Sequence, residues 1–444
     1  MSTLPLHDPE IAKLILDEDA RQLNGVSLIP SENHTSRDVL EALATTLSDK
    51  YAEGYPGRRY YSGNVVVDQI EILTQERAKK LFGVPYVNVQ PYSGSTANLA
   101  IYVATCEPHD TIMGLNLPDG GHLTHGWKFS ATAKFWNSVP YHLKPSGEFD
   151  VDEIRKLAQE HKPKIIWCGG TAIPRAIPFA EFAKIADEVG ALLIADVSHI
   201  AGLIVGGQHE SPVAHAHIVM TTTHKTLRGP RGALIMVTEK GLAKDPTLGE
   251  KIDKAIIPGT QGGPHMNTIA GIAVALKEAS QPDFQDYAKR IVENAKAFAD
   301  ALIHEGFQLV SGGTDNHLLV IDLSKTGIGR GKYFALALER VGIYANMNTI
   351  PGDTSSPLYP SGLRIGTPAA TTRGMGVDEM KHLAHWMAEV EASIKDIQLP
   401  AEKEQRAEVL KALNTTLAND PLYEKIAEEV RAMCLTFPLP ATSG

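Results

Sequence analysis

Cysteine is scarce in this sequence, and long apolar runs are missing from it. Its three cysteines, Cys106, Cys168 and Cys434, stand far apart among 444 residues, so neither a disulfide framework nor a cysteine zinc site is indicated. No apolar run reaches the roughly 20 residues that cross a bilayer. At Met1–Pro5 no basic segment leads into an apolar one. We therefore expect a cytoplasmic protein with no membrane partner.

A basic excess is missing as well. Lys and Arg number 42 against 52 Asp and Glu, which gives a net charge of -10. Nucleic-acid-binding proteins usually present a basic face, so no nucleic-acid partner is expected. The absence of a GxxxxGK[ST] pattern argues against a P-loop nucleotide site. Apolar residues at 43% and charged residues at 21% fit a globular protein, whose length suggests two domains with extensions.

Apolar strands and helical segments alternate in the middle of the chain. Strands are expected at 164–168 and 191–196 with a helix at 181–190 between them, and strand-like runs begin at 218 and 233. This alternation is typical of a buried, mostly parallel sheet in an α/β protein. The other expected features are helices at 8–24, 268–279, 283–305 and 332–341, strands at 87–90, 317–323 and 362–366, a helical pair broken near Pro421, and a domain boundary near 280.

Lys225 stands in the connection between two of these strands, beside Arg228 and Arg231. Nearby cations disfavour the charged form of a lysine. Only a neutral amine attacks a carbonyl to form a Schiff base. A solvated loop lysine is the alternative, but two other stretches supply what a pyridoxal phosphate site needs.

These two stretches are an anion cradle and a carboxylate. The strand at 87–90 runs through Ser93-Gly94-Ser95 into a helix-like segment, and free backbone N–H groups at such a turn bind phosphate. An ordinary helix cap is the alternative. Asp196 ends a strand at the sheet edge where ligands bind. It could hold a protonated pyridine nitrogen there, or only cap the next segment.

Two further patterns concern histidines and one arginine. His122 and His125 share a glycine-rich loop. With no acidic or cysteine ligand at the usual spacing we expect no metal, and prefer an imidazole stacked on a planar ring. Arg364 in an apolar strand needs an anion, either a substrate carboxylate or a structural acidic residue. Residues 30–64 are dense in Gly, Tyr and Arg, and we expect them to line a polar pocket of this or a neighbouring subunit.

Taken together, these stretches resemble the serine hydroxymethyltransferase family. The resemblance runs from about Leu28 to Pro440. It implies a pyridoxal phosphate (PLP)-dependent transferase of fold type I, with a large domain around a mostly parallel seven-stranded sheet and a smaller C-terminal α+β domain. The implied division is an N-terminal arm and intersubunit segment at 1–83, a PLP-binding domain at 84–280 and a small domain at 281–444. The motifs are Ser31–Asn33, Lys50–Tyr61, Gly120–Gly126, Asp196–Gly202, Thr221–Gly232, Gln261–Pro264, Asn348–Pro351 and Arg364–Pro368.

The resemblance also implies a role for each cofactor-site residue. Lys225 would bind pyridoxal 5'-phosphate as a Schiff base, His122 would stack on the pyridine ring, and Asp196 would pair with its nitrogen. Thr222 and His224 would steer exchange and substrate choice. The implied phosphate and ring-hydroxyl contacts are Ser93, Gly94, Ser95, Thr171 and His199, joined by Tyr51, Gly262 and Gly263 of a second subunit.

The implied substrate is serine or glycine, with tetrahydrofolate as co-substrate. Arg364 would hold the amino-acid carboxylate with Ser31 and Tyr61. Glu53 would act as acid/base at the hydroxymethyl group and folate. The remaining implied contacts are Tyr60, Leu117, Gly121, Leu123 and Asn346. Several positions differ from the family pattern: Thr96 stands where Gln is usual, and Leu117–Asp119 replaces a Ser/Ala-His step. The other departures are Thr171 for Ser, Leu358 for Phe, Ala233 for Gly and the stretch Trp127–Ser130.

The implied reaction is reversible transfer of the serine hydroxymethyl carbon to tetrahydrofolate, giving glycine and 5,10-methylenetetrahydrofolate, in a homodimer or dimer of dimers. One alternative is a related PLP aldolase or transaldolase of β-hydroxy amino acids, or an α-methylserine hydroxymethyltransferase. Glu53, Tyr60 and Asn346 favour the folate enzyme. A silent binding protein, for example one acting on RNA, is opposed by the intact Lys225 and by the acidic charge.

Overall fold

The computed structural model describes residues 7–398, 400 and 402–441. The chain packs as two compact units, one of residues 35–289 and the other of residues up to 34 together with those from 290 onward. The three-part division at 83 and 280 stays a prediction. In the part of the chain described, no helix is both long and apolar enough to cross a bilayer.

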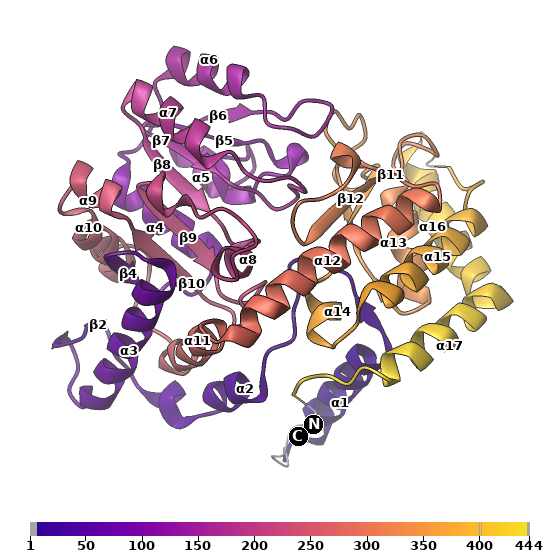
Figure 1. Ribbon diagram of the computed structural model, residues 1–444, viewed down its shortest axis with the longest axis horizontal. Coiled ribbons are helices and arrows are strands. Elements are labelled where there is room, and N and C mark those ends of the chain that lie inside the picture. Colours follow the sequence, from indigo (N-terminus) through magenta and orange to yellow (C-terminus); the bar gives the residue numbers. More distant parts are fainter. Residues whose placement is uncertain (1–6, 399, 401, 442–444) are drawn as a thin grey trace. The chain divides into compact units, whose positions relative to one another are not determined.

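The unit of residues 35–289 is built on a seven-stranded sheet of order β4-β10-β9-β8-β7-β5-β6 (Figure 1). Strand β10 pairs antiparallel with both of its neighbours, and the other pairs are parallel. The predicted mostly parallel sheet is therefore confirmed. Its strands are β4 (Tyr86–Asn88), β5 (Thr111–Leu115), β6 (Asn137–Tyr141), β7 (Ile165–Cys168), β8 (Leu192–Asp196), β9 (Ile218–Thr222) and β10 (Ala233–Val237).

Helices cover both faces of this sheet. Ile165 and Trp167 of β7 share a core with helices α4 and α10, while Ile166 between them is also fully buried and α7 packs against β7 and β8. Alternating side chains that are all buried explain why these strands are apolar without interruption. The helices of this unit are α2 (Arg37–Leu43), α3 (Val65–Phe82), α4 (Gly94–Thr105), α5 (Ala131–Phe135), α6 (Val151–His161), α7 (Phe179–Val189), α8 (Ala201–Val205), α9 (Glu239–Lys244), α10 (Leu248–Lys254) and α11 (Met266–Ala279).

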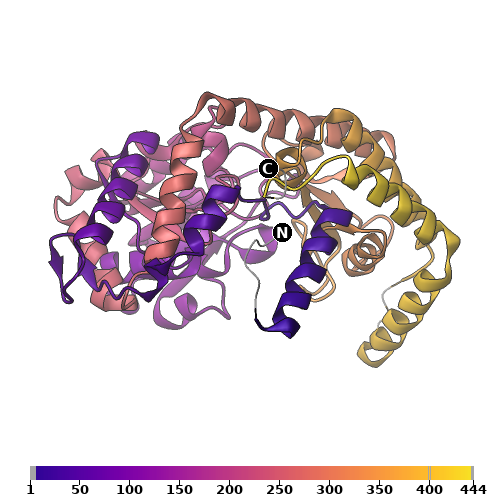
Figure 2. The same cartoon turned by 90° about the horizontal axis from the view of Figure 1, so that it is seen from below.

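A small hairpin lies at the edge of the same unit. Strands β2 (Gly54–Tyr55) and β3 (Arg58–Arg59) pair antiparallel. Helix α11 lies between α2 and α3, which it contacts on either side (Figure 2). The hairpin and α3 lie outside the seven-stranded sheet, so the alternation of strands and helices in the sequence does not predict where they pack.

The other unit is α+β. An antiparallel sheet of order β11-β12-β15-β14 packs with helices, and β1 pairs parallel with β13. Helix α12 (Pro282–His304) crosses the division between the units. The strands are β1 (Val26–Ser27), β11 (Gln308–Leu309), β12 (Leu318–Asp322), β13 (Ile343–Tyr344), β14 (Asn346–Asn348) and β15 (Gly362–Gly366); the helices are α1 (Pro9–Asn24), α13 (Gly331–Arg340), α14 (Pro368–Thr372), α15 (Val377–Ser393), α16 (Lys403–Asn419) and α17 (Pro421–Leu435).

The site residues follow from the sheet order. Strands β5, β7, β8 and β9 run parallel, so the segments that follow them meet along one edge of the sheet. Those segments hold the glycine-rich loop after β5, Thr171 after β7, Asp196 at the end of β8 and Lys225 after β9. Residues far apart in the sequence are thereby collected in one place.

Candidate active site

Lys225 lies in the connection from β9 to β10. Its Nζ donates to Thr222 Oγ1 at 2.9 Å, and the Thr222 N–H donates to Ser198 Oγ at 3.1 Å. Thr222 is buried. Arg228 has a left-handed backbone with φ of 57°, and its guanidinium lies 4.4 Å from the centroid of the Tyr287 ring. The lysine amine is therefore fixed on the side chain of the preceding strand.

The anion cradle adjoins this lysine. Ser93 caps α4, and its N–H donates to Thr96 Oγ1 at 3.0 Å. The threonine that replaces the usual glutamine thus reinforces the helix start. A Cβ added to Gly94 would lie 2.7 Å from Thr222 Cγ2, so only glycine fits between the cradle and the threonine that binds Lys225.

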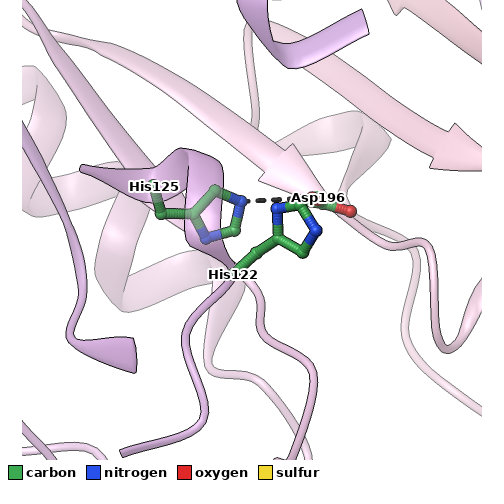
Figure 3. Close-up of side chains that lie close together, drawn as sticks. All are labelled: His122, His125 and Asp196. Atoms are coloured by element: carbon green, nitrogen blue, oxygen red, sulfur yellow. Dashed lines mark hydrogen bonds and ion pairs between the residues drawn. The ribbon is translucent and has the colours of Figure 1, made fainter. Parts of the chain in front are cut away.

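Asp196 accepts several hydrogen bonds, of which Figure 3 shows the one from His125. Its Oδ2 accepts from His125 Nε2 at 3.1 Å and from Asn98 Nδ2 at 3.2 Å, and its Oδ1 accepts from Ser198 Oγ at 2.6 Å. Burial opposes ionisation of this carboxyl, but the hydrogen bond and charge interaction with His125 outweigh it and hold the Asp196 pKa below its usual range. A permanent negative charge therefore stands at the strand end.

His122 is neutral at ordinary pH. Burial, followed by the neighbouring His125, lowers the pKa of His122 to about 4. Its Nδ1 lies 2.7 Å from Thr124 Oγ1 and accepts from the Thr124 N–H. A neutral imidazole held in this way suits stacking on an aromatic cofactor.

The sequence argument gave three of these residues no role. His125 is buried, stacks on Trp167 with ring centroids 4.8 Å apart and binds Asp196, a carboxylate that lies 71 residues further along. The histidines therefore do have an acidic neighbour, which sequence spacing could not reveal because Asp196 comes from another strand. Ser198 was readable as a local turn residue two positions after Asp196, whereas Asn98 had no local signal.

The side chains of His122, His125 and Asp196 lie close enough together to bind a metal ion. Ligand atoms of His122, His125 and Asp196 lie within 4.8 Å of one another. However, the Asp196 and His125 atoms concerned are hydrogen-bonded to each other, and His122 Nδ1 is used by Thr124. We therefore interpret the cluster as a hydrogen-bonded support for an organic ring.

The glycine-rich loop after β5 is tightly packed. A Cβ on Gly121 would collide with the Leu115 carbonyl, and the Thr171 N–H donates to Gly120 O at 2.7 Å. Asp119, in the stretch that differs from the family pattern, pairs with His142 Nδ1 at 2.8 Å. That stretch is therefore fixed by a hydrogen bond of its own. Its neighbours Leu117 and Leu123 are half-buried and exposed, respectively.

Two other predicted residues lie near the lysine connection. His199 is buried after β8, and its carbonyl accepts from Thr226 Oγ1 at 3.1 Å. Burial, then the charges of Lys225 and Arg231, lower the pKa of His224 to about 3. Within the described chain, His224 Nδ1 is buried with no hydrogen-bond partner.

The residues assigned to a second subunit gather on one surface. A Cβ on Gly262 would lie 3.1 Å from Glu53 Oε1, and a Cβ on Gly263 would lie 3.3 Å from the Tyr51 ring. The Tyr51 and Tyr61 rings have centroids 4.9 Å apart. Tyr60 beside them is 77% exposed, as expected for a residue that faces outward from its own chain.

Arg364 belongs to the other unit. It lies on β15 opposite Asn346 on β14, and its Nε donates to Asn346 Oδ1 at 3.1 Å. Burial lowers the Arg364 pKa to about 10, so the guanidinium stays charged at neutral pH. Ser31 follows the segment whose Leu28 carbonyl accepts from the Gly366 N–H at 2.7 Å. This unit therefore contains Arg364, its predicted companion Ser31 and the predicted folate contact Asn346, whereas Tyr61 belongs to the unit of residues 35–289.

Three features define a class of protein: the sheet order, a lysine that follows β9 and a carboxylate that ends the neighbouring strand β8. That class is the α/β transferases of PLP fold type I. Comparison with known proteins gives the family within that class. The sequence model for serine hydroxymethyltransferase matches residues 4–387. The chain is 52% identical over 443 residues to the serine hydroxymethyltransferase of Acidothermus cellulolyticus, covering 99% of this chain and 97% of that protein. It is 53% identical over 434 residues to the one of Sorangium cellulosum, covering 98% and 95%. The chain belongs to the serine hydroxymethyltransferase family.

Proposed function

We propose that this chain transfers the hydroxymethyl carbon of serine to tetrahydrofolate, reversibly, giving glycine and 5,10-methylenetetrahydrofolate. Family membership over nearly the whole length supports the reaction. The observation that carries it is the joint placement of Lys225, Gly94 and Asp196 at one sheet edge. An amine, an anion cradle and a permanent negative charge are what a phosphorylated pyridine aldehyde requires.

Pyridoxal 5'-phosphate fits these residues. The backbone at Gly94 has no room for a side chain, and Asp196 keeps its charge although buried. When bound, the group supplies an aldehyde for Lys225 and an electron-withdrawing ring that weakens the bonds at the substrate α-carbon. Ser93, Gly94 and Ser95 would hold its phosphate, with Thr171 and His199 near its ring hydroxyl.

The chain's own residues then orient the substrate and move protons. Arg364, with Ser31 and Tyr61, binds the amino-acid carboxylate. Thr222 holds the Lys225 amine by its hydrogen bond, and His224 lies next to it. Glu53 accepts and returns the proton of the serine hydroxyl, since a carboxylate within hydrogen-bond reach can act as a general base.

The same proposal includes a homodimer and a folate site. Tyr51, Glu53, Gly262 and Gly263 would act in the site of the partner subunit, where Tyr60 would also reach. Tetrahydrofolate would contact Leu117, Gly121, Leu123 and Asn346. We also propose that the enzyme works in the cytoplasm.

The deciding experiment measures glycine formation from serine with and without tetrahydrofolate, beside threonine cleavage. We expect glycine formation to depend on tetrahydrofolate and threonine cleavage to be slower. Brisk threonine cleavage with no folate-dependent reaction would instead identify an aldolase. A purified protein that is colourless and takes up no PLP would refute the cofactor assignment.

A further inference from the structure

The hairpin β2–β3 is fastened by one buried arginine. Arg59 is 3% exposed, and its Nη1 donates to the Ala52 carbonyl at 2.9 Å and to the Gly54 carbonyl at 2.8 Å. These are the carbonyls of the residues directly before and after Glu53. A single guanidinium therefore fixes the backbone on both sides of the proposed acid/base.

The other edge of the guanidinium is anchored on α3. Arg59 Nε donates to Asp68 at 2.9 Å and Nη2 donates to Glu71 at 2.7 Å. Glu71 is fully buried and also accepts from Gln90 Nε2 at 2.8 Å. Gln90 in turn donates to the Gly54 carbonyl at 3.0 Å. We call Arg59, Asp68, Glu71 and Gln90 the hairpin cluster.

The backbone of Glu53 is thereby held in position, and among the described residues no hydrogen bond joins its carboxylate to the cluster. Its carbonyl accepts from the Tyr60 N–H at 3.0 Å, and its Oε1 lies against Gly262. The cluster fixes the backbone, and the glycine leaves room for the side chain. A carboxylate that must meet a substrate on another subunit depends on such fixing, because a 1 Å misplacement can cost about 100-fold in rate.

We propose that Arg59 is a positioning residue for Glu53, acting through the Ala52 and Gly54 carbonyls. This rests on the proposed function, in which Glu53 is the acid/base of the folate-dependent reaction. Arginine is required because its planar fork reaches two carbonyls and two carboxylates at once, whereas a lysine ammonium cannot. The role belongs to the fork geometry and not to the positive charge alone.

The test compares Arg59→Lys with Arg58→Lys in the PLP-loaded enzyme. We expect Arg59→Lys to lower kcat of the folate-dependent reaction by about 30- to 100-fold, with the KM for serine changed by less than about threefold. Arg58 is the matched control, because its side chain is 68% exposed and forms an ion pair with Asp253 at 3.2 Å. Arg58→Lys keeps the positive charge on an exposed side chain, so its kcat should stay within about twofold of the parent value.

A double-mutant cycle separates positioning from general damage. If Arg59 acts through Glu53, adding Arg59→Lys to Glu53→Gln should cost nothing further. Multiplied losses in the double variant, or a normal kcat in Arg59→Lys, would overturn the proposal. If Arg59→Lys does not fold, Asp68→Asn replaces it, with about a three- to tenfold loss expected that vanishes in the Glu53→Gln background. A parent enzyme without folate-dependent activity would instead refute the proposed function.

Discussion

Two polar clusters of residues 35–289 bury a carboxylate, and the two carboxylates differ in pKa. In the strand-end cluster, defined as Asp196 with His122, His125 and Ser198, burial is outweighed and the Asp196 pKa is lowered. In the hairpin cluster, burial outweighs Arg59 and Gln90 and raises the pKa of Glu71. Arg59 is shared there with Asp68, whose pKa is lowered despite burial by the Gly57 N–H and Arg59.

The difference separates two uses of a buried charge. Asp196 is surrounded by hydrogen-bond donors, so it keeps a negative charge available for a cationic ring. Glu71 accepts hydrogen bonds from a neighbouring arginine and an amide, so these interactions lie within the hairpin cluster itself. The strand-end cluster provides a negative charge for the cofactor ring, and the hairpin cluster fixes the backbone around Glu53. Substitutions should therefore affect them in different ways.

The largest expected effect is at Lys225. Lys225→Ala should abolish the visible absorbance of the purified enzyme and lower activity by about 1,000-fold or more, as for loss of a covalent catalyst. Glu53→Gln, in the hairpin region, should lower the folate-dependent kcat by about 100- to 1,000-fold, the scale for loss of a general acid or base, leave a measurable rate and keep the colour. Spectra and serine assays on both variants check this. A Lys225→Ala protein that stays coloured after removal of free cofactor would contradict the assignment of Lys225 as the residue that binds the cofactor.

The placement of Asp196 and Lys225 at one sheet edge was predictable from the sequence, whereas the contacts of Asp196 with His125 and Ser198 and the hairpin cluster were not. Parallel strands end at one edge of a sheet, so Asp196 and Lys225 could be placed together from their positions alone. The strand at 362–366 and the helix at 283–305 also agree with β15 and α12 to within a residue. In contrast, β2 and β3 have two residues each, too few for a period to show. Gln90 reaches Glu71 across 19 residues, and no local pattern signals that contact.

The next largest effect is expected from removing the charge of Asp196. Asp196→Asn keeps the shape but not the charge, and we expect kcat/KM to fall by about 100- to 1,000-fold, the scale for losing one preorganised electrostatic group. Glu71→Gln is the matched change in the hairpin cluster. Since Glu71 acts on the hairpin backbone through Arg59 and Gln90, the loss of activity should be about tenfold, with an unchanged cofactor spectrum. Equal losses, or equal spectral changes, would show that the clusters do not differ in this way.

Two glycines provide a smaller, steric comparison. In Gly94→Ala the new Cβ would lie 2.7 Å from buried Thr222, and such overpacking costs about 1–3 kcal/mol of stability. In Gly262→Ala the contact is 3.1 Å to the carboxylate of Glu53, a side chain that can move, so stability should change by less than about 0.5 kcal/mol. Urea unfolding of both variants measures the difference. A larger loss in Gly262→Ala would mean that the Glu53 side chain is held rigidly.

The smallest expected effect is on the pH dependence of stability. An unfolded histidine binds a proton below about pH 6.5, whereas His122 in the folded protein stays neutral down to about pH 4. The unfolded state therefore holds the extra proton in this window, and the free energy of unfolding falls as the pH falls from 6.5 toward 4. His122→Phe should flatten that slope by up to about 1.4 kcal/mol per pH unit. Tyr60→Phe, an exposed change in the hairpin region, should leave it unaltered. Urea titrations of cofactor-free protein at pH 7.5, 6.5, 5.5 and 4.5 (about one unit apart, to span the window) give the slopes, and an identical slope in His122→Phe would mean that folded His122 is protonated as readily as an unfolded histidine.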